Sequence, residues 1–180
     1  MTVGLEQMTD LCNYSKAETI ARQQVSTAKG EAVTAITENI SMDVIESEML
    51  SLPQVECPVT HHFGPGVYIR EAFLPAGTYV MGHAHKCEHM NMMIKGKMAV
   101  IVNGEAKVIE GPYIFTGQPG RKLAYILEDT VFQNIYGTDE TDPAVIEDMY
   151  VDKSAAWVAS ELEKQCIDLA VMEHFERIAA

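Results

Sequence analysis

Residues 77–96 read GTYVMGHAHKCEHMNMMIKG, and this stretch decides the fold. Three of the chain's 6 histidines lie in it: His83, His85 and His89. Side chains on a strand alternate between its two faces, so His83 and His85 point to the same side. His89 follows across an expected bend and can bring a third nitrogen to the same point. Because neutral imidazole binds divalent transition metals well, the spacing favours a metal site over three solvated histidines at a sheet rim.

Short β-prone runs alternate with turn signals on both sides of this stretch. The expected strands are residues 67–73, 78–81, 90–94, 97–102, 106–109, 113–116, 123–127 and 131–136. Asn103-Gly104 is the strongest turn signal between them, because both residues tolerate the positive φ of a two-residue hairpin. Strands this short and this regularly spaced predict an antiparallel sandwich or barrel rather than a parallel α/β sheet.

Helical patterns flank the strand-rich region. A capping-box sequence at residues 15–18 predicts a first helix that stops at Gly30, and a second helix over 42–50 ends before Pro53. Residues 153–180 carry apolar side chains at helical spacing over a broad face, which we expect to be buried on the barrel or on another subunit. The predicted division is therefore an N-terminal extension over 1–51, a β-barrel over 52–152 and a C-terminal helix over 153–180.

The charge of the chain argues against several classes of function. The 180 residues carry a formal net charge of −13, which repels phosphate backbones and anionic membrane surfaces. We therefore expect neither a nucleic-acid nor a membrane partner. No signal peptide is visible, and no apolar run approaches the roughly 20 residues of a membrane span. The 4 cysteines are scattered without a C-x-x-C pair, which favours free thiols and a cytoplasmic location.

The stretch 77–96 resembles the first motif of the cupin superfamily, G-x5-H-x-H-x3,4-E-x6-G. Gly77, His83, His85 and Gly96 keep its spacing, and His89 stands where the family usually has glutamate. The resemblance implies a double-stranded β-helix, a jelly-roll-like barrel, over about residues 60–137. It also implies a divalent metal ion (iron, zinc, nickel or manganese) on the histidines. The run from residue 52 through the histidines further resembles small cupins encoded in tailed-phage genomes.

The second cupin motif, G-x5-P-x-G-x2-H-x3-N, is degraded in this chain. Pro119-Gly120 resembles its turn, but the position of its metal-binding histidine falls near Leu123. A fourth protein ligand is therefore left open. Three residues are candidates for an additional ligand or for the pocket: Glu88, which competes with His89 but has the opposite strand parity, Tyr125, and His62.

Two classes of function follow from the resemblance. The first is a metal-dependent oxygenase, isomerase or lyase acting on a small anionic organic molecule, because three neutral imidazoles leave the ion its full charge. The second is a non-catalytic ligand-binding or structural module, associated with phages. The degraded second motif favours this class, because a missing ligand weakens metal affinity. The resemblance implies a homodimer with a small-molecule ligand in either case. The sequence does not decide between the two classes and identifies no catalytic residue.

Overall fold

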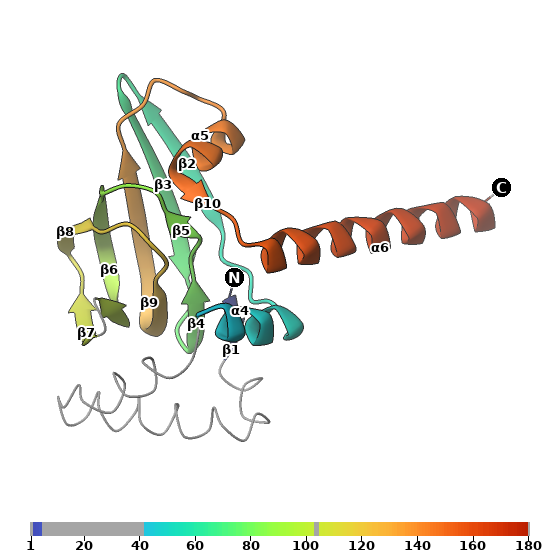
Figure 1. Ribbon diagram of the computed structural model, residues 1–180, viewed down its shortest axis with the longest axis horizontal. Coiled ribbons are helices and arrows are strands. Elements are labelled where there is room, and N and C mark those ends of the chain that lie inside the picture. Colours follow the sequence, from blue (N-terminus) through green and yellow to red (C-terminus); the bar gives the residue numbers. More distant parts are fainter. Residues whose placement is uncertain (1, 5–41, 103–104, 180) are drawn as a thin grey trace.

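The computed structural model describes residues 2–4, 42–102 and 105–179, and its fold is mainly β with flanking helices, as predicted (Figure 1). None of the helices within these ranges combines the length and the apolarity that a membrane span requires. In chain order the elements are β1 (Thr2–Gly4), α4 (Met42–Ser51), β2 (Val59–Gly64), β3 (Val67–Leu74), β4 (Thr78–Met81), β5 (Ala84–His85), β6 (His89–Val102), β7 (Glu105–Glu110), β8 (Tyr113–Gly117), β9 (Leu123–Tyr136), α5 (Pro143–Tyr150), β10 (Val151–Asp152) and α6 (Ala155–Ala179).

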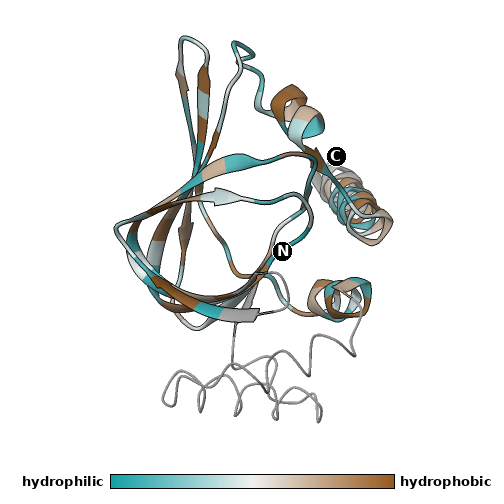
Figure 2. Cartoon of the chain, turned by 60° about the vertical axis from the view of Figure 1, so that its left-hand side comes forward, coloured by the Kyte–Doolittle hydropathy of each residue, from teal (hydrophilic) through white to brown (hydrophobic). Residues whose placement is uncertain are grey.

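Strand β9 lies at the centre of an antiparallel sheet. Its first half pairs with β4 and its second half with β3, while β6 runs along the other side of both halves. Strands β1 and β2 continue the sheet beyond β4 and β3, and both β7 and β8 pair with β6. Figure 2 shows that the sheet curves until its two arms face one another across a concave side. The concave face is therefore the interior of a barrel-like shape.

Two pairs of expected strands are single long strands in the structure. Residues 90–94 and 97–102 both belong to β6, because Gly96 forms a bulge rather than the expected turn. Gly96 has a φ of 100°, and a Cβ at this position would overlap Thr130 Oγ1 on the neighbouring strand. Only glycine fits this close approach. Residues 123–127 and 131–136, expected as two strands, likewise belong to one strand, β9.

The two faces of the sheet bury different apolar clusters. On the concave face, Met93 and Ile126 are fully buried at the centre of the larger cluster. On the opposite face, helix α4 covers β4 with the side chains of Ile45 and Met49. At the end of the sheet where β6 begins and β9 ends, a third cluster packs Ile146 and Tyr150 of α5 against Tyr68 and Tyr136, and polar side chains lie between it and the larger cluster.

A buried ion pair ties α4 to the loop before β9. Arg121 Nη1 lies 2.8 Å from Glu46 Oε2 and 3.4 Å from Asp43 Oδ1, and the side chains of Arg121 and Glu46 are 13% and 3% exposed. The same loop forms reciprocal backbone hydrogen bonds between Gly120 and His85 on β5. The ion pair therefore also helps to position one of the predicted site residues.

The C-terminal helix does not pack on the barrel, which was one of the two expected ways of burying its apolar face. After its first turn, α6 extends away from the sheet (Figure 1), so the barrel does not cover it. Its exposed apolar side chains are Val158, Leu162, Ile167, Leu169, Val171 and Met172. The expected helix after residue 15 and the expected turn at 103–104 lie outside the described residues, although Val102 and Glu105 do pair across β6 and β7.

Candidate functional site

Strand register brings a set of polar side chains onto the concave face. Directly opposite residues of an antiparallel pair point to the same face. Asn91 on β6 lies opposite Asn134 on β9, and Asn134 Nδ2 donates to Asn91 Oδ1 at 2.8 Å. Two residues away on each strand, and therefore on the same face, lie His89 and Tyr136, whose ring centroids are 5.3 Å apart. The site is thus built from the start of β6 and the end of β9.

A short strand adds a second imidazole to this pair. Strand β5 is held by antiparallel pairing with β10 and by the backbone hydrogen bonds to Gly120. The ring of His85 stacks on His89 with centroids 4.0 Å apart, and Tyr136 Oη shares a hydrogen bond of 3.0 Å with His85 Nδ1. We call these three side chains the His85–His89–Tyr136 cluster.

An amide network fixes the buried ring of His89. Its Nδ1 donates to the carbonyl oxygen of Cys87 at 3.2 Å, so in the neutral ring Nε2 is the acceptor. The Asn91 side chain also interacts with His89, and its Oδ1 accepts a hydrogen bond from Asn134 Nδ2 at 2.8 Å. Gly117 leaves the space for this contact, since a Cβ there would overlap Asn91 Nδ2 and lie 2.8 Å from His89 Nε2.

Burial keeps the cluster uncharged at neutral pH. It is the main cause that lowers the pKa of His85 to about 3, and nearby positive charges lower it further. Burial also lowers the pKa of His89, although the hydrogen bonds with Cys87 and Asn91 oppose this. The same burial raises the pKa of Tyr136. The cluster therefore presents two neutral imidazoles and a protonated phenol.

His83 makes its ring contact with a different partner. The ring meets Trp157, in the first turn of α6, edge to face with centroids 4.8 Å apart. Burial, as the largest cause, lowers the pKa of His83 as well. The expectation that His83 and His85 share one strand is wrong, because β4 ends at Met81 and β5 begins at Ala84. His83 lies between the two strands, where strand parity does not set its direction.

The metal ion predicted from the sequence does not fit this arrangement. A site of three histidines needs one free nitrogen from each ring, aimed at a common point. His89 Nδ1 is engaged by the carbonyl oxygen of Cys87, and the ring of His83 packs against Trp157 rather than joining the stack of His85 and His89. Within residues 42–102 and 105–179, no three His, Cys, Asp or Glu side chains are grouped so that they could hold a metal ion. The three-histidine ligand set therefore stays a prediction.

The three additional candidates lie at separate places. Glu88 is exposed and lines the cavity described below. Tyr125 packs on Tyr79, with ring centroids 4.8 Å apart, on the face that α4 covers. His62 Nε2 lies 3.8 Å from Glu71 Oε2, with its side chain 48% exposed. Neither Tyr125 nor His62 therefore joins the cluster on the concave face.

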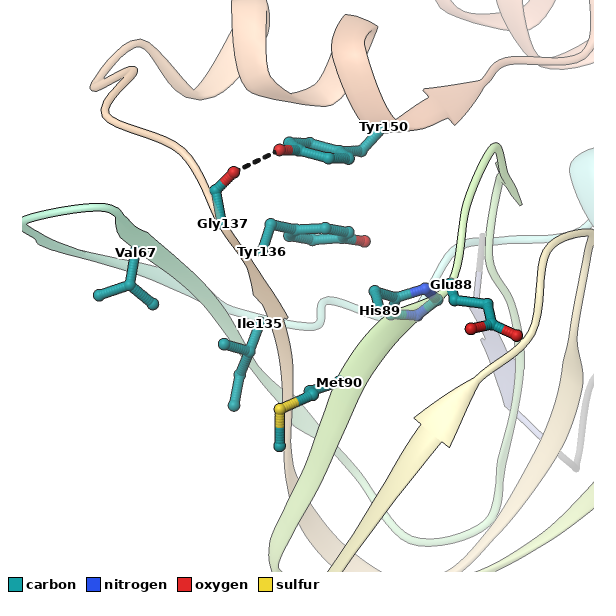
Figure 3. Close-up of a pocket in the computed structure, with 8 residues that line it drawn as sticks. All are labelled: Val67, Glu88, His89, Met90, Ile135, Tyr136, Gly137 and Tyr150. Carbon is teal, nitrogen blue, oxygen red and sulfur yellow. Dashed lines mark hydrogen bonds between the residues drawn. The ribbon is translucent and has the colours of Figure 1, made fainter.

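A cavity of about 320 Å³ opens beside the cluster. Figure 3 shows the ring of Tyr136 between those of Tyr150 and His89, with the Glu88 carboxylate pointing away from the apolar wall. The Tyr136 and Tyr150 rings stack with centroids 4.5 Å apart, and Tyr150 Oη donates to the carbonyl oxygen of Gly137 at 2.8 Å. The full lining is Val67, Glu88, His89, Met90, Ile135, Tyr136, Gly137 and Tyr150. Val67, Met90 and Ile135 alternate with concave-face residues, so the cavity wraps around the end of the sheet and its apolar wall belongs to the outer face. This wall suits a planar or apolar group.

Sequence reasoning does not identify Tyr136, Asn91 or Asn134 as site residues. Their convergence depends on the pairing of β6 with β9, which are far apart in the chain. The available signal is alternation: residues 89 and 91 share one face of a strand, as do 134 and 136. Of the adjacent pair of histidines on β2, His61 rather than His62 faces the concave side, where His61 Nδ1 and Tyr68 Oη share a hydrogen bond of 2.6 Å.

Comparisons with known proteins extend to the fold alone. No protein-family model and no curated protein matches the chain. An RmlC-like cupin family protein with a double-stranded β-helix fold from Methanocaldococcus jannaschii is 17% identical, with 47% of this chain and 82% of that one covered and a TM-score of 0.40. The cupin domain of an XRE family transcriptional regulator from Enterobacter cloacae is 13% identical, with 47% of this chain and 98% of that one covered and a TM-score of 0.39. KdgF from Halomonas sp. is 14% identical, with 47% of this chain and 84% of that one covered and a TM-score of 0.38. Matches of this strength carry no argument about the site or its activity.

Proposed function

We propose that this chain binds a small organic molecule at the end of its sheet where β6 begins and β9 ends, at the His85–His89–Tyr136 cluster and the cavity beside it. The observation that supports the proposal is the lining of this end of the sheet, where two imidazoles, a phenol and the Asn91–Asn134 amide pair converge beside an aromatic cluster of Tyr68, Tyr136 and Tyr150. Burying polar groups costs free energy that apolar residues would not. A cavity with aromatic walls and a few convergent polar groups is the usual form of a small-molecule site.

The cluster offers a ligand neutral hydrogen-bonding groups. His85 uses Nδ1 for Tyr136 Oη, and its Nε2 has no hydrogen-bond partner among the described residues. That nitrogen can therefore donate to or accept from a ligand, according to the tautomer that Tyr136 selects. The rings of Tyr136 and Tyr150 supply a flat apolar wall. Binding needs no further component, so it is the function that these residues support best.

The proposal is tested by imidazole NMR on the full chain. Long-range ¹H–¹⁵N spectra report each histidine ring, and benzoate and benzamide serve as planar probes. We expect saturable shifts for His85 and His89 with at least one probe, and smaller shifts in a Tyr136→Ala variant. His62, on the outer face, is the internal control and should not shift. Spectra in which neither probe moves the His85 and His89 signals would overturn the proposal.

A second candidate is metal-dependent chemistry on a small anionic molecule, of the oxygenase, isomerase or lyase type. The proximity of the neutral His85 and His89 rings, with centroids 4.0 Å apart, favours it, because imidazole is a good ligand for later first-row transition metals. It requires His83 to leave Trp157. When bound, a divalent ion would supply a Lewis acid.

Metal analysis separates the two candidates. The chain is purified without chelators or a histidine-rich tag, and its metal content is compared with that of His83→Ala, His89→Ala and the control His62→Ala. Stoichiometric metal in the parent and the control, lost in the other two variants, would support the second candidate. A metal-free parent that still binds a planar probe would support the first.

We also propose that the chain forms a homodimer. The exposed apolar side chains of α6 support it, since an apolar face of this extent is usually covered in the assembled protein. Sedimentation velocity of the full chain over a range of concentrations tests the point. A monomer at all concentrations would contradict it. The cytoplasmic location and the phage-associated structural role stay predictions.

A further inference from the structure

Arg70 on β3 lies in the same row of the sheet as the amide pair. It is directly opposite Asn134 on one side and His61 on the other. Since opposite residues share a face, its side chain points to the concave side. Tyr68, two residues earlier on the same strand, also faces that side and shares its hydrogen bond with His61 there. Arg70 thus places a guanidinium group on the concave face beside His61, Tyr68 and the Asn91–Asn134 amide pair.

The guanidinium group of Arg70 has no protein partner in the described part of the chain. Arg121, in contrast, is held by Glu46 and Asp43. Arg70 is only partly exposed, and its five donors neither hydrogen-bond nor form an ion pair with any described residue. A chain with 26 acidic residues has many carboxylates that could have been placed opposite this charge. A partly buried cation without a counterion costs free energy that a ligand could recover.

The charge of Arg70 is within electrostatic reach of the cluster. Burial raises the pKa of Tyr68 and Tyr136, and the Arg70 charge opposes that rise. Burial lowers the pKa of His85, and Arg70 is among the positive charges that lower it further. The guanidinium group and the cluster therefore share one face of the sheet and influence each other electrostatically.

We propose that Arg70 is the anchor for the carboxylate of the bound molecule, so that the ligand class is a small organic acid with a planar or apolar remainder. This inference rests on the function proposed for the end of the sheet where β6 begins and β9 ends. The planar fork of a guanidinium group matches a carboxylate with two parallel hydrogen bonds. The charges also match, because one guanidinium group neutralises one carboxylate, whereas a phosphate dianion would leave a negative charge beside the Glu88 carboxylate, which already lines the cavity.

The test compares benzoate with benzamide, which have the same shape but differ in charge, and uses inorganic phosphate as a third probe. Affinities come from the His85 imidazole shifts of the parent chain and of Arg70→Gln, Arg70→Lys and the surface control Lys95→Gln. We expect benzoate to bind at least about tenfold more weakly to Arg70→Gln than to the parent, because hydrogen bonds to a charged group are strong. Arg70→Lys should lose part of the affinity, and Lys95→Gln none. Benzamide should bind the parent and Arg70→Gln equally.

Each other outcome counts against the inference in a distinct way. Equal binding of benzoate and benzamide to the parent would overturn the role of Arg70 while leaving the proposed function intact. Unchanged benzoate affinity in Arg70→Gln would do the same, as would binding of phosphate in preference to benzoate. A parent whose His85 signal responds to no probe would overturn both proposals. Circular dichroism of each variant confirms that the fold is retained, and Arg70→Lys replaces Arg70→Gln if the latter unfolds.

Discussion

Acidification should destabilise the chain through His85. Burial lowers the pKa of this ring from 6.5 to about 3, so the unfolded state takes up a proton at a higher pH than the folded state does. Stability from the neutral ring is therefore fully present above pH 6.5 and is lost as the pH falls from there toward 3. At a pH of about 5, this difference in pKa lowers the free energy of unfolding by roughly 2 kcal/mol relative to neutral pH. Solvent screening of the partly exposed ring reduces this to about 1 kcal/mol.

Urea denaturation of the parent and of His85→Phe at about pH 7.5 and about pH 5 measures this effect. Phenylalanine keeps a ring in the stack but cannot be protonated, so the parent should lose about 1 kcal/mol more than the variant on acidification. The control is His62→Phe, whose ring is already half open to solvent on the outer face and should leave the parent's pH dependence unchanged. An equal loss in the parent and in His85→Phe would refute the buried, neutral state of His85.

Two further changes test the supports of the site. Gly117→Ala should lower the free energy of unfolding by about 1–3 kcal/mol in urea denaturation, because the added Cβ displaces Asn91. Gly82→Ala, where no atom lies within 4 Å of the new Cβ, should cost much less, and equal losses would contradict the clash. Arg121→Met should cost about 3 kcal/mol, because it leaves Glu46 buried at 3% exposure without a counterion. Adding Glu46→Met should recover part of that loss, and a further loss instead would show that the pair is not coupled.

The sequence predicts much of the fold because local patterns carry it. Glycine, proline and asparagine at the turns mark the strand boundaries, so most strands begin or end within a residue or two of their expected limits. Gly96 is the informative failure. It carries a turn signal, yet its neighbour across the sheet decides between a turn and a bulge, and that neighbour, Thr130, is set by long-range pairing. The local sequence shows that Gly96 can adopt a positive φ, but it does not show whether that φ belongs to a turn or to a bulge.

The candidate site was accessible to sequence reasoning only in part. His85 and His89 come together as expected because a bend lies between them, whereas His83 does not, because its segment leaves the strand before reaching it. Tyr136 and Arg70 have no local signature. Each takes its place through strand pairing across the whole domain, so its role appears only once the register is known.

A crystal structure of the full chain with 4-bromobenzoate tests the central claim most directly, because the anomalous signal of bromine locates the ligand without ambiguity. We expect a single strong peak on the concave side, with the ring against Tyr136 and the carboxylate at Arg70. A bromine peak only at the outer surface would contradict the claim. So would a concave face occupied by a metal ion on His83, His85 and His89.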